Sequence, residues 1–150
     1  IKSPEILEWI KTNIDDFFFE AQVDIHIYIE GKFVMGVECK AYTENAMMKR
    51  ILVDFTLLKQ IHPNINSVLF QLESQLGGDY SNPSKKIVLG SHSTHTLLSH
   101  FDIDLHILTL LEGERKVDKA IHKKEHFKEL NERNLMKALE VFKQLLTPYL

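Results

Sequence analysis

The chain has 150 residues, of which 44% are hydrophobic and 26% are charged, and its formal net charge is −3. These values suit one compact domain over residues 1–150 and exclude a strongly basic nucleic-acid-binding protein defined by its bulk charge. Cys39 is the single cysteine, which excludes a disulfide framework or a multi-cysteine zinc site within the chain and favours a reducing, intracellular setting. The apolar runs are only a few residues long, which is too short to span a membrane.

Hydrophobic periodicity predicts both helices and strands along the chain. Apolar residues recur at helical spacing after Ser3-Pro4, a typical helix start, whereas from Val23 they alternate with polar residues as in a strand. Gly31-Lys32 supplies a tight turn between two strands, and Pro63 ends the second long helix. In chain order, we expect a helix over residues 4–20, strands over 23–30 and 33–40, a helix from Thr43 as its N-cap to Ile61, strands over 67–72 and 87–89, a short helix over 94–100, a strand over 103–110 and a helix over 118–146. This order is typical of one α/β domain with helices layered on a mixed sheet.

The stretch VECKAY, at the end of the second expected strand, carries two opposite charges two positions apart. Alternate residues of a strand face the same side, so Glu38 and Lys40 lie together on one face, while Val37 and Cys39 lie on the other. One interpretation is an ordinary ion pair at a strand end, facing solvent. Cys39 is expected to be a buried small residue rather than a nucleophile.

A second interpretation adds Asp24, which begins the preceding strand of the hairpin. Asp24 and Glu38 supply the hard oxygen ligands that Mg²⁺ prefers, and Mg²⁺ keeps several waters of its own. Lys40 beside them is able to orient or deprotonate an attacking water, or to stabilise negative charge on a phosphate. Hydrolysis of a phosphodiester needs this combination of anionic ligands, a metal and a nearby cation.

The motif Val23-Asp24 … Val37-Glu38-Cys39-Lys40, followed by a helix and another strand, resembles the PD-(D/E)XK nuclease superfamily. This group includes many type II restriction endonucleases and several repair and recombination nucleases, and Val23 stands where the motif's name has proline. The resemblance covers residues 4–110. It implies one nuclease domain with a restriction endonuclease-like three-layer core, in which a central mixed β-sheet of four to five strands is flanked by helices. It also implies a Mg²⁺-dependent DNA endonuclease in which Asp24 and Glu38 bind the metal and Lys40 is the active-site lysine.

The hairpin sets a geometrical condition on this site. With a two-residue turn at Gly31-Lys32 and regular pairing, Asp24 faces the side of the sheet opposite to Glu38. An odd-length loop or a β-bulge is needed to bring the two carboxylates together. We therefore expect a distorted hairpin, and a regular one contradicts the site.

A further metal ligand on the first helix is implied by the resemblance alone. Glu8 is the first choice and Glu20 the second, although most acidic residues on such a helix simply face solvent. The eight histidines are a weaker alternative as a zinc site, because they show no recognisable zinc-binding spacing.

Basic and amide side chains around the motif are expected to contact DNA. Lysine and arginine near a helix N-terminus suit phosphate oxygens, and glutamine is able to pair with adenine through two hydrogen bonds. An ordinary polar surface is the alternative explanation for each of them. The candidates are Lys49, Arg50, Gln71, Gln75, Lys85 and Lys86.

A chain of this length has room for a catalytic core but little more for elaborate sequence recognition. The resemblance therefore predicts double-stranded DNA as substrate and either a homodimer or a heterodimer with a larger DNA-recognition subunit, as in a heterodimeric type IIS enzyme with a small catalytic subunit. We expect a cytoplasmic, prokaryotic protein of a restriction system. A Holliday-junction resolvase-like or repair nuclease stays open as an alternative, as does a non-catalytic α/β protein-interaction module.

Overall fold

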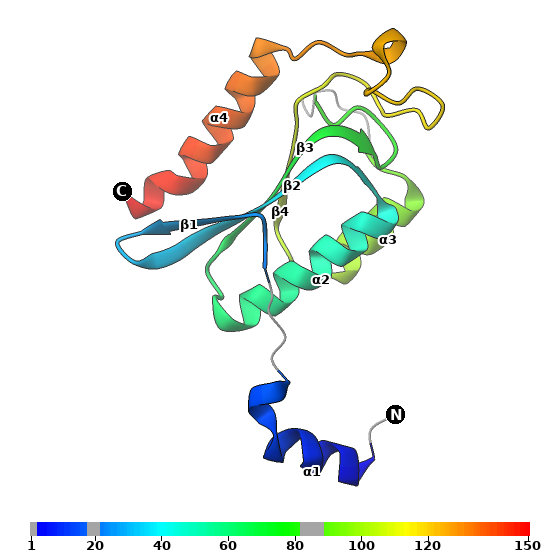
Figure 1. Cartoon of the computed structure of the whole chain (residues 1–150). Helices are drawn as coiled ribbons and strands as arrows, with labels where there is room; N and C mark the ends of the chain where they lie inside the picture. The colour runs from blue at the N-terminus through cyan, green and yellow to red at the C-terminus, as the bar shows by residue number, and fades with distance from the viewer. Residues whose placement is uncertain (1–2, 18–21, 82–88) are drawn as a thin grey trace.

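The computed structural model describes residues 3–17, 22–81 and 89–150. Its helices and strands alternate along the chain, as the periodicity predicts (Figure 1). Within the described residues, no helix is both long and apolar enough to cross a membrane. In chain order, the elements are α1 (Pro4–Thr12), the 3-10 helix η1 (Ile14–Asp16), β1 (Ile25–Ile29), β2 (Lys32–Glu44), α2 (Asn45–Ile61), β3 (Asn66–Gln75), α3 (His92–His100), β4 (Leu105–Thr109), η2 (Lys124–His126), α4 (Glu132–Leu146) and η3 (Thr147–Tyr149).

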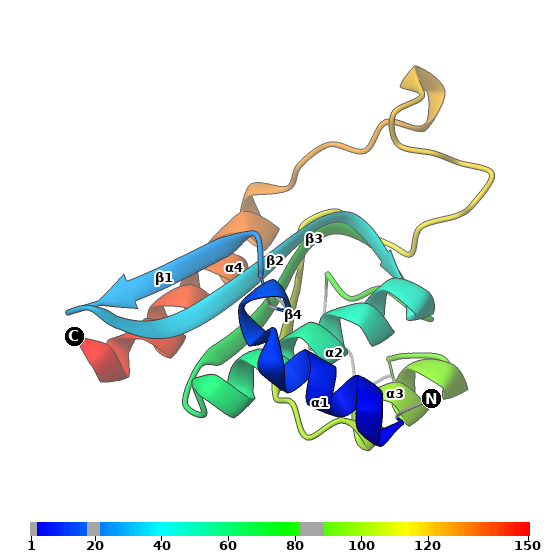
Figure 2. The same ribbon diagram turned by 60° about the horizontal axis from the view of Figure 1, so that its bottom comes forward.

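The four strands form one mixed sheet in the order β1-β2-β3-β4. β1 pairs with β2 in the antiparallel sense, and β2, β3 and β4 are parallel to one another. Helices α2 and α3 cover one face of this sheet and α4 covers the other (Figures 1 and 2). The three-layer α/β core with a central mixed sheet of four strands, predicted from the sequence, is confirmed.

Each face of the sheet has its own hydrophobic core. On the α2 side, Met48, Leu52 and Phe55 are fully buried against Leu69 of β3. The core on the α4 side is built mainly from β2, with Val68 of β3, Leu108 of β4 and Ala138 of α4. Fully burying a large apolar side chain contributes about 1.5–3 kcal/mol, so these two cores stabilise the sheet that carries the charged residues of β2.

The β1–β2 hairpin is distorted in the way that the sequence predicts. Its turn consists of Glu30 and Gly31, with φ of 49° and 76°, one position earlier than the expected Gly31-Lys32. Positive φ at both central residues is typical of a type I′ turn, which matches the twist of the flanking strands. The register then shifts between Ile27 and Tyr28, which leaves Val34 of β2 without a partner on β1. This β-bulge changes which residues of the two strands face each other.

Helix α1 is shorter than expected and lies apart from the sheet (Figure 1). It ends at Thr12 rather than residue 20 because the side chain of Asn13 donates a hydrogen bond to the carbonyl oxygen of Trp9, at 2.8 Å. A side-chain bond of this kind offers the backbone an alternative to a further helical turn. Residues 18–20 of the expected helix lie outside the described residues.

The ends of two other elements differ from expectation. Strand β2 continues to Glu44, and Thr43 is a buried strand residue paired with Ser74, so the prediction of Thr43 as a helix cap is wrong. Strand β3 continues to Gln75, because β2 provides a pairing partner along its whole length. Residues 87 and 88 of the expected short strand lie outside the described residues.

The last helix begins at Glu132, so the expectation of a helix from residue 118 is wrong. Residues 111–131, called the arm below, form an irregular excursion with only the short η2 turn (Figure 2). Val117 and Phe127 are each 72% exposed, so these two large apolar side chains find no face of the sheet to pack on. An isolated helix of this length is marginal in water without such packing. The side chain of Asn131 instead caps α4 by accepting a hydrogen bond from the backbone N–H of Arg133.

Candidate active site

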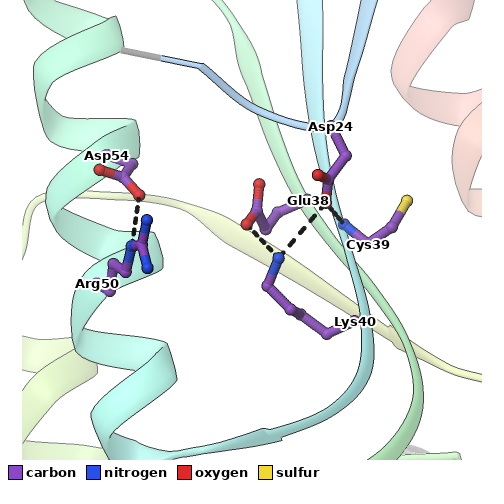
Figure 3. A network of polar contacts seen from close by, with 6 residues as sticks. All are labelled: Asp24, Glu38, Cys39, Lys40, Arg50 and Asp54. Atoms are coloured by element: carbon purple, nitrogen blue, oxygen red, sulfur yellow. Dashed lines mark hydrogen bonds and ion pairs between the residues drawn. The ribbon is translucent and has the colours of Figure 1, made fainter. Parts of the chain in front are cut away.

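The bulge brings Asp24 and Glu38 to the same face of the sheet. Ile25 pairs with Val37, and the same register carried one residue further sets Asp24 opposite Glu38. The Oδ2 atom of Asp24 also accepts a hydrogen bond of 2.7 Å from the backbone N–H of Cys39, which ties the start of β1 to the middle of β2 (Figure 3). The distorted hairpin that the site requires is therefore confirmed.

Lys40 lies between the two carboxylates. Its Nζ is 2.5 Å from Oε1 of Glu38 and 3.5 Å from Oδ2 of Asp24 (Figure 3). Partial burial by itself lowers the pKa of Lys40, but the hydrogen bond and charge of Glu38, followed by those of Asp24, outweigh it and raise this pKa above its ordinary value. Lys40 is therefore held as a cation between two anions, and all three side chains retain access to solvent.

The three charged residues open onto a cavity of about 560 Å³ between the sheet and α2. Arg50 and Asp54 reach it from α2, one helical turn apart, with 3.9 Å between Nε of Arg50 and Oδ2 of Asp54 (Figure 3). The sequence reasoning did not select Asp54, although its spacing from Arg50 was a signal that both lie on one helix face. The lining residues are Gln22, Val23, Asp24, Glu38, Lys40, Met47, Arg50, Ile51 and Asp54.

Cys39 lies next to this cluster but belongs to the opposite face. Its side chain packs against the hydrophobic core on the α4 side, as expected from the alternation along β2. Burial raises the pKa of the Cys39 thiol, the charges of Asp24 and Glu38 raise it further, and Lys40 partly opposes them. A thiol in this environment is a poor nucleophile at neutral pH, because the thiolate is the reactive form.

The donor set of the site fits a divalent metal of the Mg²⁺ type. Asp24 and Glu38 offer carboxylate oxygens on one small surface, and Mg²⁺ is commonly bound by one or two carboxylates while it keeps several waters. No group of three or more His, Cys, Asp or Glu residues suited to a metal occurs among the residues that the structure describes. Glu8 lies on α1, where its carboxylate is 3.8 Å from Nζ of Lys11, and the structure does not bring it to the two carboxylates.

The residues expected to contact DNA are distributed unevenly. Arg50 lines the cavity, whereas Lys49 is exposed on α2 without lining it. Gln71 is only 1% exposed, and its amide nitrogen donates to Oγ1 of Thr109 at 2.9 Å, so this side chain has no surface with which to read a base. Gln75 is half-buried at the end of β3 and accepts a hydrogen bond from Arg115. Both lysines of the pair expected to contact the DNA backbone, Lys85 and Lys86, lie outside the described residues.

Comparison with known proteins points in the same direction as the geometry. The chain is 51% identical over 148 residues, or 98% of its length, to the protein named type II restriction enzyme DdeI from Desulfomicrobium norvegicum. The chain spans 61% of the length of this curated relative. No family model matches the chain, and no solved structure matches it.

Proposed function

We propose that this chain is a Mg²⁺-dependent endonuclease that hydrolyses phosphodiester bonds of double-stranded DNA, as the catalytic domain or subunit of a restriction enzyme. The observation that carries the proposal is the convergence of Asp24, Glu38 and Lys40 on one cavity, which depends on the bulge in the hairpin. The similarity to a protein named as a type II restriction enzyme supports it.

In this proposal, Asp24 and Glu38 hold the metal through their carboxylate oxygens. A divalent metal bound there lowers the pKa of a coordinated water and neutralises negative charge on the phosphate. The backbone N–H of Cys39 keeps the Asp24 carboxylate turned toward Glu38, at 2.7 Å from Oδ2. Orienting a ligand in advance of binding avoids reorganisation during the reaction.

Lys40 has a separate role, because its ammonium group donates hydrogen bonds and carries positive charge. With a metal held by Asp24 and Glu38, Nζ of Lys40 would be able to donate to a phosphate oxygen or to the attacking water instead of to the two carboxylates. Fixed cationic donors at the point where negative charge grows are among the largest contributors to rate enhancement. Lys40 is thus proposed to orient the nucleophile and to stabilise the transition state.

DNA contacts are proposed on the cavity side of α2. Arg50 projects into the cavity and is suited to a phosphate next to the scissile one, because its guanidinium donates two parallel hydrogen bonds. Lys49 and Gln75 are proposed as contacts further along the duplex. For Lys85 and Lys86, contact with the DNA backbone stays a prediction from the sequence.

We further propose that the chain works with a second subunit, either another copy or a larger DNA-recognition subunit, in the cytoplasm of a prokaryotic cell. Helix α1 supports this proposal, because it buries none of its residues. Exposed apolar side chains that gather on one segment commonly mark a protein interface. Trp9 of α1 packs edge-on against Phe17, with 5.0 Å between ring centroids, and both remain exposed. Light scattering of the purified chain, alone and with Trp9→Ala, tests self-association.

The test of the function is cleavage of supercoiled plasmid with Mg²⁺ or with EDTA, using the intact chain, Glu38→Ala and Lys40→Ala. We expect the intact chain, but neither variant, to nick or linearise the plasmid in a metal-dependent manner. Lys11→Ala, on an exposed face of α1, is the control and should cleave normally. Cleavage that survives both site substitutions contradicts the assignment. Calorimetric binding of Mn²⁺ by the intact chain, lost in Glu38→Ala, provides a readout that does not require a second subunit.

A further inference from the structure

The arm differs in charge from the rest of the chain. Residues 115–128 read RKVDKAIHKKEHFK and contain six lysines or arginines against two acidic residues, in a chain whose net charge is −3. The sequence predicts a helix from residue 118 for this stretch. The irregular conformation instead gathers the positive charge on a projecting segment (Figure 2).

Four of the five lysines of the arm form no ion pair within the described residues. Lys116, Lys119, Lys123 and Lys124 are exposed, and none forms an ion pair in the part of the chain that the structure describes. Asp118 and Glu125 are the two acidic residues of residues 115–128, and in the described part of the chain they form no ion pair with these four lysines. Glu73 is paired with Lys128, and Glu112 and Glu114 accept hydrogen bonds at the base of the arm. The positive charge of the arm is therefore available to an external anion.

The base of the arm is fixed to the same sheet that carries the candidate active site. The guanidinium of Arg115 lies over the ring of Tyr42, 3.7 Å from its centroid, and also donates to Oε1 of Gln75. The backbone N–H of Arg115 donates to the carbonyl of Ser74 at 2.8 Å. On the return side, Nζ of Lys128 is 2.6 Å from Oε1 of Glu73, which is 1% exposed. Because a buried carboxylate that loses its partner is costly, this pair holds the arm in place.

One of these anchors lies on β2, the strand that carries Lys40. Tyr42 follows Lys40 by two residues on β2 and points to the same face, so the two side chains are about 7 Å apart along the strand. Duplex DNA carries one negative charge per ~1.7 Å of its axis, so a duplex with a phosphate at Lys40 presents several more phosphates within the reach of the arm. A basic, exposed segment anchored beside a phosphodiester-cleaving site suits the DNA backbone that flanks the cleaved bond.

We propose that the arm binds the phosphate backbone of DNA next to the cleavage site through Lys119, Lys123 and Lys124. This inference rests on the proposed function, and it assigns to the arm the affinity for flanking DNA rather than a part in the chemistry. Contacts to phosphates carry no sequence information, so the arm contributes binding that is independent of sequence. Lys116 directly follows the anchored Arg115, and Lys128 is paired with Glu73, so neither is included.

The test compares two triple variants with the same change in charge. The arm variant is Lys119→Ala/Lys123→Ala/Lys124→Ala, and the control is Lys11→Ala/Lys32→Ala/Lys143→Ala, which removes exposed lysines from α1, the hairpin turn and α4. Binding of a fluorescent DNA duplex is measured by anisotropy in Ca²⁺ between about 50 and 200 mM salt. Thermal melting by circular dichroism checks that both variants fold.

We expect the arm variant to bind DNA at least about tenfold more weakly and to lose about 2–3 from the slope of log K against log salt, since each phosphate contact contributes about 0.9. The control variant should keep a slope close to that of the intact chain. Equal loss in both variants overturns the proposal. An arm variant that loses binding to polyglutamate but keeps its DNA affinity assigns the arm to an acidic protein surface and also overturns it.

Parallel cleavage assays separate this proposal from the proposed function. If the intact chain binds DNA through the arm but does not cleave it with Mg²⁺, the endonuclease assignment fails and the arm proposal stands. If the intact chain cleaves DNA and both triple variants bind DNA with the same affinity, the arm proposal fails but the endonuclease assignment stands. An intact chain that neither binds nor cleaves DNA overturns both.

Discussion

Glu38 and Glu73 each form an ion pair with a lysine, but the two pairs differ in burial and in the role that we infer for them. At the candidate active site, Lys40 lies 2.5 Å from Glu38 and also reaches Asp24, and the cluster faces a cavity of about 560 Å³. At the base of the arm, Lys128 lies 2.6 Å from Glu73, whose carboxylate is buried. One lysine shared by two accessible anions is able to exchange partners, whereas one lysine that neutralises a single buried anion is not. The two ion pairs have nearly equal distances, yet one belongs to the candidate active site and the other anchors the arm.

The strongest test of the difference between the two ion pairs is to neutralise Glu38 and Glu73 in separate variants. Glu38→Gln is expected to lower the rate of plasmid cleavage roughly 1000-fold, equivalent to about 4 kcal/mol of transition-state stabilisation, because it removes one of the two carboxylates proposed to hold the metal. Its free energy of unfolding, measured with urea, should change by less than about 1 kcal/mol. Glu73→Gln is the matched control and should retain the rate of the cleavage step under single-turnover conditions. Equal losses of rate in both variants would contradict the distinction.

The next largest effect is expected from the other partner of the buried pair. Lys128→Met leaves the Glu73 carboxylate buried without its cation, and should lower the free energy of unfolding by roughly 3 kcal/mol. The double variant Glu73→Leu/Lys128→Met should recover most of this loss, since it removes the buried charge altogether. Lys124→Met, on the exposed part of the arm, serves as control. A Lys128→Met protein as stable as the intact chain would show that Glu73 needs no partner.

A smaller effect is expected at the second anchor of the arm. Tyr42→Leu removes the ring beneath the guanidinium of Arg115 and should lower the free energy of unfolding by about 0.5–1 kcal/mol. Tyr42→Phe keeps the ring face and should lie within a few tenths of a kcal/mol of the intact chain. Urea unfolding of the three proteins gives the comparison. If Phe and Leu destabilise equally, the hydroxyl rather than the ring is what matters.

The smallest effect concerns Cys39, which reports the charge of its neighbours. Burial raises the pKa of Cys39 above 9.0, the charges of Asp24 and Glu38 add to the increase, and Lys40 opposes it. A raised pKa means less thiolate in the folded chain than in the unfolded chain at the same pH, so alkylation by iodoacetamide should be slower when folded. For the same reason, the thiol favours folding below about pH 9, and this contribution is lost as the pH rises through the folded pKa.

Asp24→Asn should move the pH–rate profile of this alkylation to lower pH, with a change in rate below about tenfold. Mass spectrometry of the single cysteine gives the rate directly. Asp54→Asn is the control, because that carboxylate faces the cavity from α2 and is not among the charges that act on the thiol. A profile unchanged by Asp24→Asn would mean that the charge of Asp24 does not contribute to the pKa of Cys39.

The candidate site was largely predictable from the sequence because its parts are close along the chain. Asp24, Glu38 and Lys40 belong to one hairpin, in which alternation fixes the face of each side chain and even the need for a bulge follows from counting residues. The layer order followed from the succession of helical and strand periods. Asp54 was not selected, since only the packing of α2 on the sheet shows that it faces the cavity.

The arm was not predictable for the converse reason. Its residues are good helix formers, and nothing near them in sequence indicates that Lys128 is drawn to Glu73 or Arg115 to Tyr42. Those partners lie on strands far earlier in the chain, so the conformation depends on tertiary contacts that override local propensity. The early end of α1 and the buried Thr43 have the same origin, in specific bonds and pairings rather than in periodicity.

The unpaired Val34 has a consequence for how such hairpins are recognised. In a regular hairpin with a two-residue turn, two residues face each other only if their sequence numbers differ by an odd number. The numbers of Asp24 and Glu38 differ by an even number, so these residues face each other only because of the bulge. Deleting Val34 would leave every charged group in the chain and yet turn one carboxylate to the far surface. A search for nuclease motifs by letters alone would accept that variant, whereas a test of parity would reject it.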